Sequence, residues 1–280
     1  MASDLNDKIR TFYDESTPLW LDHWGEHMHH GFYGLDGRAQ KPRIEAQTDM
    51  IRELLEWADI TVAENILDLG CGVGGSARHL ARQFDAQVLG LTLSPVQAEA
   101  AARYNRQSGL ADKVSVQVKD MMQLQPAENL FDLIWSMESA EHIADKQGLL
   151  NLCRSLLTPG GCLLMATWCR RDTTTKSLTS SEEKLLHQIG RFYHLPPMIS
   201  MSQYENLAQD AGFKKVKTAD WSAAVAPFWG EVIRSALTWR GLTGLLHSGT
   251  GTIKGAWAMR YMRQGYQTGL IRFGVLQAWL

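Results

Sequence analysis

Short apolar runs alternate with amphipathic stretches over the first two thirds of the chain, and this alternation limits the available folds most strongly. The apolar runs, typical of buried strands, are residues 65–70, 86–93, 113–120, 131–137 and 162–168. The stretches with helical spacing that precede or separate them are residues 48–57, 75–84, 94–109 and 147–161. Ser94 followed by Pro95 is a typical helix start. Strands separated by helices pair in parallel with right-handed crossovers, so the sequence predicts a doubly wound α/β sheet.

The first apolar run ends in a glycine-rich turn within ILDLGCGVGGSARHL, residues 66–80. In such a sheet, ligands bind beyond the carboxyl ends of the strands, where glycine lets the backbone approach them closely. A P-loop is excluded because the turn lacks the required lysine, and a dinucleotide site is disfavoured because the second run ends in GLTLSP, without an acidic residue. Asp68 would repel a pyrophosphate but attract the sulfonium and ammonium of S-adenosylmethionine (SAM). The alternative is a purely structural turn capped by Asp68.

The last hundred residues are expected to supply an insertion and a cap. Residues 172–200 are predicted to form an inserted helical segment, 201–213 a helix and 214–222 a later strand. The chain beyond residue 226 is rich in large side chains, most of them expected in the core and the rest in a cap for a bulky hydrophobic ligand. These are Phe228, Trp229, Trp239, Trp257, Met259, Tyr261, Met262, Tyr266 and Trp279. Residues 268–280 are predicted as an amphipathic helix able to touch a membrane, although they contain a single cation.

Composition excludes several partners. The chain has 280 residues, a formal net charge of −2 and no basic tract, so a nucleic-acid partner is not favoured. No apolar run approaches the roughly 18 residues that span a bilayer. The four cysteines lack a zinc-binding spacing and suggest reduced thiols, from which a cytoplasmic location is expected.

Several motifs together resemble one family. ILDLGCGVGGSARHLA is similar to motif I of class I SAM methyltransferases, with Asp68, Gly70, Gly72 and Gly74 in the pattern E/DxGxGxG. FYDESTPLWLDHWGEHMHHGFY, LTLSPVQ, WSMESAEHI, ADWSAAVAPFW and TIKGAWAMRYMRQGYQTGLIRF extend the likeness to the gamma-tocopherol methyltransferase family over almost the whole chain. Motif I is widely shared, whereas the HMHHG block and the C-terminal segments are more specific. The resemblance implies a Rossmann-like class I methyltransferase fold, with a seven-stranded, mostly parallel sheet that ends in an antiparallel hairpin, and a helical cap.

The resemblance also implies the cofactor and the residues that hold it. SAM is the expected cofactor and S-adenosylhomocysteine its product. Gly70 and Gly72 would wrap the methionine part, and Asp68 would orient that loop and the ammonium group. The remaining positions are Thr92, Leu93 and Gln97 for the ribose, Asp120 and Met121 for the adenine, and Ser136 and Met137 for the sulfonium side. Asp120 has a simpler alternative as a turn cap.

Three ionisable residues follow the fourth apolar run. Carbon methylation of a phenol requires a base for the phenolic proton and the loss of a ring proton, and a carboxylate or imidazole can serve. Glu138 and His142 are predicted to face the acceptor, with Glu141 as a cap or an orienting partner, because neighbours on a helix point in different directions. The alternatives are that His142 is a buried hydrogen-bonding residue, and that positioning and desolvation alone supply the rate.

The first 45 residues are predicted to form a lid segment across the SAM site. The resemblance places Tyr13 near the cofactor carboxylate and Gly31 at a tight backbone contact, while the alternative is that the aromatic residues only clamp an N-terminal helix. The spacing of the histidines in HMHHG is not standard for zinc, so no metal is predicted. The expected division is a lid at residues 1–45, a SAM-binding core at 46–225 and a substrate cap at 226–280.

The leading function is SAM-dependent methylation of a bulky, hydrophobic aromatic small molecule, with carbon methylation of a tocopherol-like chromanol as the first case. N-methylation of an indole-type alkaloid by a related enzyme is the second. A SAM-binding protein without turnover is the third, and the intact motif I and WSMESAEHI residues argue against it. Peripheral membrane contact and the oligomeric state stay open, because apolar C-terminal helices suit either a lid or an interface.

Overall fold

The computed structural model describes residues 2–125, 130–236 and 250–280. Within them, seven strands form one sheet in the order β3-β2-β1-β4-β5-β7-β6, in which only β7 runs antiparallel to its neighbours. The strands are β1 (Asn65–Leu69), β2 (Gln87–Thr92), β3 (Val114–Val118), β4 (Phe131–Met137), β5 (Leu157–Arg170), β6 (Lys215–Asp220) and β7 (Ile271–Trp279). The predicted seven-stranded sheet with a terminal antiparallel hairpin is therefore confirmed.

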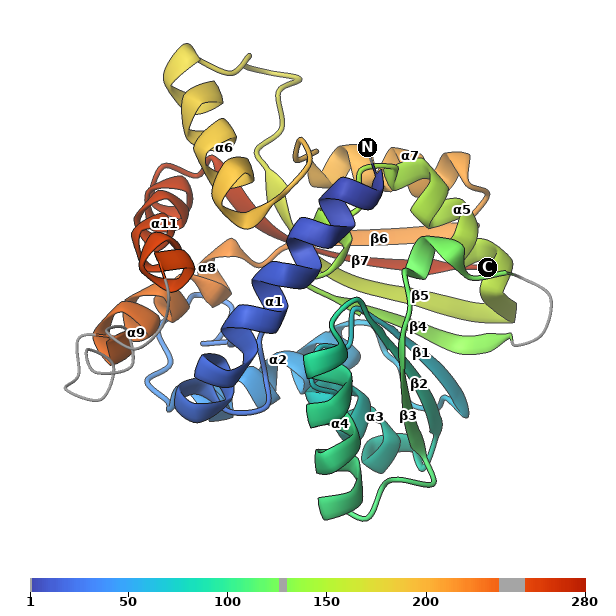
Figure 1. Cartoon of the computed structure of the whole chain (residues 1–280). Coiled ribbons are helices and arrows are strands. Elements are labelled where there is room, and N and C mark those ends of the chain that lie inside the picture. Colours follow the sequence, from blue (N-terminus) through green and yellow to red (C-terminus); the bar gives the residue numbers. More distant parts are fainter. Residues whose placement is uncertain (1, 126–129, 237–249) are drawn as a thin grey trace.

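Helices cover both faces of the sheet (Figure 1). The helices are α1 (Ala2–Trp24), α2 (Arg43–Trp57), α3 (Gly75–Phe84), α4 (Pro95–Gln107), α5 (Lys146–Leu156), α6 (Ser180–Tyr193), α7 (Met201–Asp210), α8 (Ser222–Val225), α9 (Pro227–Ala236) and α11 (Thr250–Gln267). One apolar core lies between the sheet and the helices α2 and α3, and a second lies between the sheet and the helices α5 and α7. The predicted start of α4 is confirmed, because the Ser94 hydroxyl accepts a hydrogen bond from the backbone N–H of Gln97.

Two predicted elements differ from the structure. The terminal helix expected at residues 268–280 is wrong, because Ile271–Trp279 is the strand β7 between β5 and β6. This strand is buried on both faces, so its residues do not alternate between apolar and polar, and periodicity alone does not distinguish it from a helix. The second difference is at residues 157–161, which were assigned to a helix end and instead begin β5.

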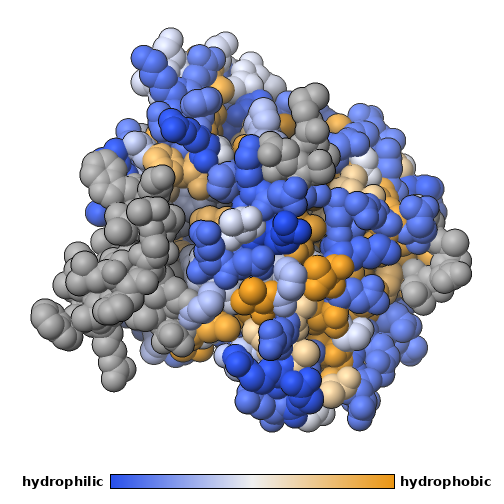
Figure 2. All heavy atoms as spheres, viewed as in Figure 1, coloured by the Kyte–Doolittle hydropathy of each residue, from blue (hydrophilic) through white to orange (hydrophobic). Residues whose placement is uncertain are grey.

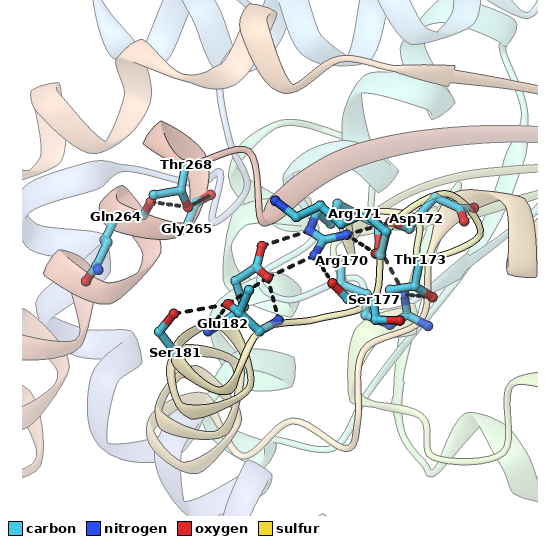
Figure 3. A network of polar contacts seen from close by, with 12 residues as sticks. Arg170, Arg171, Asp172, Thr173, Ser177, Ser181, Glu182, Gln264, Gly265 and Thr268 are labelled. Carbon is cyan, nitrogen blue, oxygen red and sulfur yellow. Dashed lines mark hydrogen bonds and ion pairs between the residues drawn. The ribbon is translucent and has the colours of Figure 1, made fainter.

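The insertion after β5 contains the predicted helix, α6, and a polar network fixes its first turn (Figure 3). The Arg171 guanidinium donates to both carboxylate oxygens of Glu182, each at 2.8 Å. Glu182 also completes a capping box with Thr179, the N-cap residue of α6. The backbone N–H of Arg171 donates to the carbonyl of Leu270 at 2.8 Å. The insertion is thereby joined to the chain between α11 and β7, and α6 packs against α11.

The helix α1 crosses the face of the molecule drawn in Figure 1 and contacts both α4 and α11. Its residues Asn6, Ile9 and Tyr13 line a cavity together with residues that follow the strands β1 to β4. Figure 2 shows this face as mainly hydrophilic, with hydrophobic residues gathered over α4 and the β3 edge, where Val96 and Val118 are exposed. None of the described helices has the length and apolar character needed to cross a membrane.

Candidate active site

The turn after β1 is built from three glycines with positive φ, +79° at Gly70, +54° at Gly72 and +77° at Gly74. A Cβ at Gly70 would lie 2.4 Å from the Cβ of Ser139, so this glycine allows close packing of two loops. A Cβ at Gly72 would meet only the sulfur of Met28, at 3.7 Å. Gly72 therefore leaves space toward the cavity, whereas Gly70 is needed mainly for packing, a distinction that the motif did not reveal.

Asp68 lies beneath this turn and is 1% exposed. Burial raises the pKa of its carboxyl to about 7, and the backbone N–H of Ala77 and the charge of Arg78 only partly offset this effect. Its Oδ2 has no hydrogen-bond partner among the described residues, and the residue lines a cavity beyond the carboxyl ends of the strands. A buried carboxylate oxygen without a donor is the group that the ammonium of SAM would satisfy.

Most of the predicted cofactor residues meet around this one cavity. The predicted residues that line it are Tyr13, Asp68, Gly70, Gly72, Thr92, Leu93, Gln97, Asp120, Met121, Met137, Glu138 and His142. Ser136 does not line it, because its hydroxyl is turned to the hydroxyl of Ser139, 2.9 Å away. The strand-end rule thus locates the cavity, but it does not tell which face of a buried strand end is open.

The far end of the cavity offers neutral and acidic acceptors. The Thr92 hydroxyl donates to Oε1 of Gln97 at 2.7 Å, which holds this pair at the end of β2 where a ribose is expected. Asp120 accepts one hydrogen bond from the Met122 N–H at 2.9 Å and another from the side chain of Asn6, also at 2.9 Å. Asp120 therefore caps a short 3₁₀ turn and also faces the cavity, so the predicted roles as a turn cap and as an adenine contact are compatible.

Glu138 follows β4 directly and adopts a left-handed conformation with φ +52°. Its Oε1 accepts the backbone N–H of His30 at 2.5 Å, and its Oε2 accepts His30 Nδ1 at 2.7 Å and the indole Nε1 of Trp168 at 2.9 Å. Burial favours the neutral acid, but the interactions with His30 outweigh burial and lower the pKa of Glu138. A positive φ in a non-glycine residue indicates a conformation that the surrounding contacts impose.

His142 lies on the 3₁₀ turn Ala140–His142, and its Nε2 lies 3.1 Å from the hydroxyl of Tyr13. Burial and the nearby Lys146 lower the pKa of His142 to about 4, so the imidazole is neutral near pH 7. Burial raises the pKa of Tyr13 above its usual value, so the phenol keeps its proton. The Tyr13 hydroxyl therefore donates to the imidazole, and this pair closes one side of the cavity.

Glu141 is placed behind this turn and does not line the cavity. Its Oε2 accepts the hydroxyl of Thr167 at 2.9 Å, and burial, with the charge of Glu138, raises its pKa to about 8. Lys146 donates to the carbonyls of Ala140 and Glu141 at 2.8 and 3.0 Å, which fixes the turn that carries His142. Glu141 was predicted to be a cap or an orienting partner, and the role of an orienting partner fits this position behind the turn.

The lid segment is joined to the core by side chains that sequence reasoning did not single out. Asn6 reaches Asp120, Asp14 accepts the Ser94 hydroxyl, and Gln97 Nε2 lies 3.4 Å from the sulfur of Met28. Glu26 pairs with Arg78 at 2.5 Å. A Cβ at Gly31 would lie 2.6 Å from the Cβ of Ala46, so the expected tight contact of Gly31 is present. Nothing in the sequence spacing indicates these pairings, because each joins residues far apart in the chain.

The histidines of HMHHG form no metal cluster in the part of the chain that the structure describes. His29 Nδ1 bonds to the carbonyl of His30 at 2.9 Å, and its Nε2 lies 3.3 Å from Nδ1 of His27. Burial lowers the pKa of His27 to about 3 and also lowers that of His29. The expectation that the protein binds no metal stays a prediction.

Several cap residues also lie away from the cavity. Phe228, Trp229 and Met262 are buried, in a cluster with α6 and the start of β7. Trp239 and the side chain of Trp257 lie outside the described residues, so their predicted roles have no structural test. The division into lid, core and cap likewise stays a prediction. The segment predicted as the cap, residues 226–280, also contains β7, which is a strand of the central sheet.

Replacing Asp68 with asparagine should weaken SAM binding by about 10- to 100-fold at pH 7.5, the loss expected for one charge-assisted hydrogen bond. Because the pKa of Asp68 is about 7 in the free protein, its charge is largely absent at pH 5.5 and present at higher pH. The ratio of wild-type to variant affinity should therefore rise from pH 5.5 to 7.5, as measured by titration calorimetry. Asp112→Asn, at an exposed position, is the control. Equal affinity of Asp68→Asn and wild type across this range would exclude the proposed ammonium contact.

SAM binding should slow hydrogen exchange across residues 10–35. The segment encloses the cavity through Tyr13, Met28 and His29, so an open state is needed to admit a ligand of this size. Exchange measured by mass spectrometry, with and without saturating S-adenosylhomocysteine, tests this expectation. The helix α7, whose residues do not line the cavity, serves as the internal reference. Unchanged protection of residues 10–35 would mean that the segment is fixed structure rather than a lid.

Comparison with known proteins gives one consistent family. A methyltransferase domain model matches residues 66–161. The chain is 43% identical to a probable tocopherol O-methyltransferase of Oryza sativa over 97% of its length and 77% of the relative. It is 43% identical to the tocopherol O-methyltransferase of Arabidopsis thaliana over 97% of its length and 81% of the relative, and 32% identical to norajmaline N-methyltransferase of Rauvolfia serpentina over 95% and 94%.

The fold has close counterparts among solved structures. Geranyl diphosphate C-methyltransferase of Streptomyces coelicolor, solved with S-adenosyl-L-homocysteine, superposes with a TM-score of 0.76 at 19% identity, over 98% of this chain and 97% of that one. Both plant tocopherol relatives are named chloroplastic, and this overturns the expected cytoplasmic location. Reduced thiols indicate a reducing environment, but they do not distinguish one such compartment from another.

The glycine turn, the buried acid beneath it and the strand-end cavity are those of a SAM-dependent class I methyltransferase. The likeness to the plant relatives continues on both sides of that domain, through the lid segment and the C-terminal strand. The chain therefore belongs to the tocopherol methyltransferase family of SAM-dependent enzymes.

Proposed function

We propose that the protein transfers a methyl group from SAM to a ring carbon of a tocopherol-like chromanol. The observation that carries this proposal is the 43% identity to two tocopherol methyltransferases over 97% of the chain. That likeness includes the lid and cap segments, which lie outside the methyltransferase domain at residues 66–161 and from which acceptor contacts are expected. Norajmaline N-methyltransferase matches over a similar share of the chain but at 32% identity, so the higher identity to the tocopherol enzymes favours a tocopherol-like acceptor.

The polar groups that line the cavity match those of the cofactor. Asp68 offers a carboxylate oxygen for the ammonium, the Thr92–Gln97 pair offers polar groups for the ribose, and Asp120 offers acceptors for the adenine amino group. When bound, SAM supplies an electrophilic methyl group on a cationic sulfur. The task of the surrounding residues is then to position the acceptor ring and move its protons.

Carbon methylation of a phenol makes two demands on the site. The phenolic proton must be taken so that the ring becomes nucleophilic, and the proton on the attacked carbon must then leave. Two separate imidazoles lie near the end of β4, His142 beside Tyr13 and His30 beside Glu138. Methylation at the phenolic oxygen, the reaction in the names of the plant relatives, needs only one proton acceptor. The presence of two such groups favours the ring carbon.

His142 is proposed to receive the proton that leaves the ring carbon. Its imidazole is neutral near pH 7, because burial lowers its pKa to about 4, so it can accept a proton. The Tyr13 hydroxyl, which lines the cavity and donates to Nε2, provides a route by passing its own proton to the imidazole while accepting one from the ring. Glu141 and Lys146 hold the turn that carries His142 in place.

N-methylation of an indole-type alkaloid is the second candidate, favoured by the 32% identity to norajmaline N-methyltransferase. An amine is already nucleophilic when neutral, so such an acceptor would need little help from a base. Loss of a proton-accepting side chain would therefore lower its methylation less than that of a phenol. The variants at the end of β4 thus separate the two acceptor classes as well as the two chemistries.

A product analysis tests the function directly. Purified protein with SAM is incubated separately with tocopherols and with indole alkaloids, and the products are measured by mass. We expect a gain of one methyl group on a tocopherol lacking a ring methyl, and NMR of the product should place it on the aromatic ring. A methyl ether would contradict carbon methylation, and turnover confined to the alkaloids would replace the proposal with the second candidate. No turnover with any acceptor would support a SAM-binding protein without catalysis.

A further inference from the structure

His30 is buried between Glu138 and a group of aromatic side chains, and only one of its two ring nitrogens has a partner. The residue is 1% exposed, and its Nδ1 lies 2.7 Å from Oε2 of Glu138. Its Nε2 has no hydrogen-bond partner among the described residues. His30 is therefore held on one side by Glu138, while its other ring nitrogen is free to interact with a ligand.

The hydrogen bonds at Glu138 decide which tautomer His30 adopts. Three donors converge on this carboxyl, the backbone N–H and Nδ1 of His30 and the indole N–H of Trp168. They stabilise its ionised form, which is acceptor-only, so Nδ1 must carry the hydrogen of the bond that joins the two side chains. In the neutral imidazole, Nε2 then has the free lone pair.

The same three donors make Glu138 a poor proton acceptor. A carboxylate that already accepts several hydrogen bonds gives up part of them when it is protonated, and the pKa of Glu138 is lowered accordingly. Nε2 of His30 has no such competing bond. The carboxylate instead fixes the ring orientation and stabilises the imidazolium that would form after a proton transfer.

The surroundings of His30 are suited to an aromatic acceptor. Its ring centroid lies 4.5 Å from that of Phe228, 5.1 Å from Trp229 and 5.4 Å from Phe273. Trp229 Nε1 and the Tyr266 hydroxyl in this cluster are also buried without a partner among the described residues. Buried polar atoms are nearly always hydrogen-bonded, so three unpartnered ones in an aromatic cluster indicate a site that a polar group on an aromatic ligand completes.

We propose that the aromatic cluster around His30 receives the phenol ring of the acceptor and that Nε2 of His30 takes its phenolic proton, with Glu138 as the positioning residue. This inference rests on the proposed function, because an amine acceptor has no such proton to lose. Since His30 is 1% exposed in the structure, the side chains of Phe228 and Trp229 must move apart from it when the ring enters.

The proton movements balance. Nε2 accepts the phenolic proton as a ring carbon forms its bond to the methyl group, and the methyl–sulfur bond breaks with its electron pair left on sulfur. The resulting ring is a dienone that carries both a hydrogen and the new methyl on one carbon. That hydrogen leaves as a proton to the Tyr13–His142 pair, and the imidazolium of His30 returns its proton to the ring oxygen. The net products are a methylated phenol, S-adenosylhomocysteine and one proton.

The first test replaces His30 with asparagine, whose side-chain amide can still donate to Glu138 in the place of Nδ1 but has no counterpart of Nε2. Phenol turnover should fall by about 100- to 10,000-fold, while affinity for S-adenosylhomocysteine and the melting temperature stay close to wild type. Adding Glu138→Gln to this variant should lower turnover little further, because the two residues act as one unit. His187→Asn, exposed on α6, is the matched control.

The outcomes separate this inference from the proposed function. Phenol turnover by His30→Asn at the wild-type rate, with a large loss in Glu138→Gln, would make Glu138 the base and overturn the inference alone. Wild-type protein that methylates no phenol would overturn the proposed function.

The second test does not depend on turnover or on the stability of a variant. In wild-type protein labelled with ¹⁵N-histidine and bound to S-adenosylhomocysteine, NMR should find His30 protonated at Nδ1 and unprotonated at Nε2. The Nε2 signal should shift when a non-reactive phenol is added. A suitable phenol is a chromanol that keeps its hydroxyl group but has a methyl group on every available ring carbon. A protonated Nε2 in the S-adenosylhomocysteine-bound protein before phenol is added, or no shift with saturating phenol, would overturn the inference.

Discussion

Replacing His142 with alanine is expected to lower phenol turnover by about 100- to 10,000-fold, the usual cost of losing a general base. The imidazole is neutral near pH 7, since burial holds its pKa at about 4, and the Tyr13 hydroxyl connects it to the cavity. Because the loops after β1, β2 and β3 are expected to supply most of the cofactor contacts, SAM affinity should stay within a few-fold of wild type. Steady-state kinetics and calorimetry on the same preparations measure the two effects separately.

Two further variants show whether the loss belongs to this imidazole. His187→Ala makes the same exchange at an exposed position on α6 and should leave kcat unchanged. Tyr13→Phe keeps the imidazole but removes the hydroxyl that donates to it, so turnover should fall by less than in His142→Ala. Normal turnover of His142→Ala at every pH from 6 to 9 would show that positioning alone drives the reaction and that no base is needed here.

Replacing Gly70 with valine is expected to abolish measurable SAM binding. A valine at φ +79° is strained, and its Cβ would lie 2.4 Å from the Cβ of Ser139, far inside van der Waals contact. Ser139 in turn donates to the carbonyl of Leu69, at the end of β1. Relief of the clash must therefore displace either the glycine turn or the loop with Glu138 and His142. Titration calorimetry with SAM and thermal melting report the two consequences.

Gly109→Val separates strain from collision. Gly109 also has a positive φ, +67°, but no atom lies within 4 Å of an added Cβ. This variant should lose some stability while keeping SAM affinity near wild type, because the position is at the end of α4 and outside the cavity. If Gly70→Val bound SAM as well as Gly109→Val does, the turn after β1 would not be the cofactor loop.

The parallel strands and the helices between them can be predicted from the sequence, because the apolar residues of each element repeat at a clear spacing and each element ends at a clear boundary. The strands β1 to β4 and the helices α3 and α4 lie where the alternation of patterns placed them, and Ser94 starts α4 as expected. The helix α5 and the strand β5 are also present, but residues 157–161 belong to the strand and not to the helix. The failure at Ile271–Trp279 has a physical cause. An inner strand is apolar on both faces, so it lacks the period-two pattern by which a strand is recognised.

Part of the candidate site could likewise be predicted from the sequence, and part could not. Asp68 and the acceptors after β2 and β3 could be placed because strand ends of a parallel sheet converge on one edge. The direction of a side chain beyond such an end depends on the local backbone, and for this reason Ser136 was predicted to line the sulfonium side although its hydroxyl faces Ser139 instead. The pairing of His30 with Glu138 joins segments 108 positions apart and depends on the unusual φ of Glu138. No sequence spacing encodes a contact of that kind.

The position of β7 has a consequence for how the chain folds. Among the described strands it is the last in the sequence, yet it lies between β5 and β6 and is the only described neighbour of β6 in the sheet. During synthesis, β6 must therefore wait without a partner until residues 271–279 have left the ribosome. The cofactor loops after β1, β2 and β3 are complete long before that point. A nascent chain should thus be able to bind SAM before its sheet is closed, and a cofactor already in place would favour the correct final strand pairing over exposed-edge association.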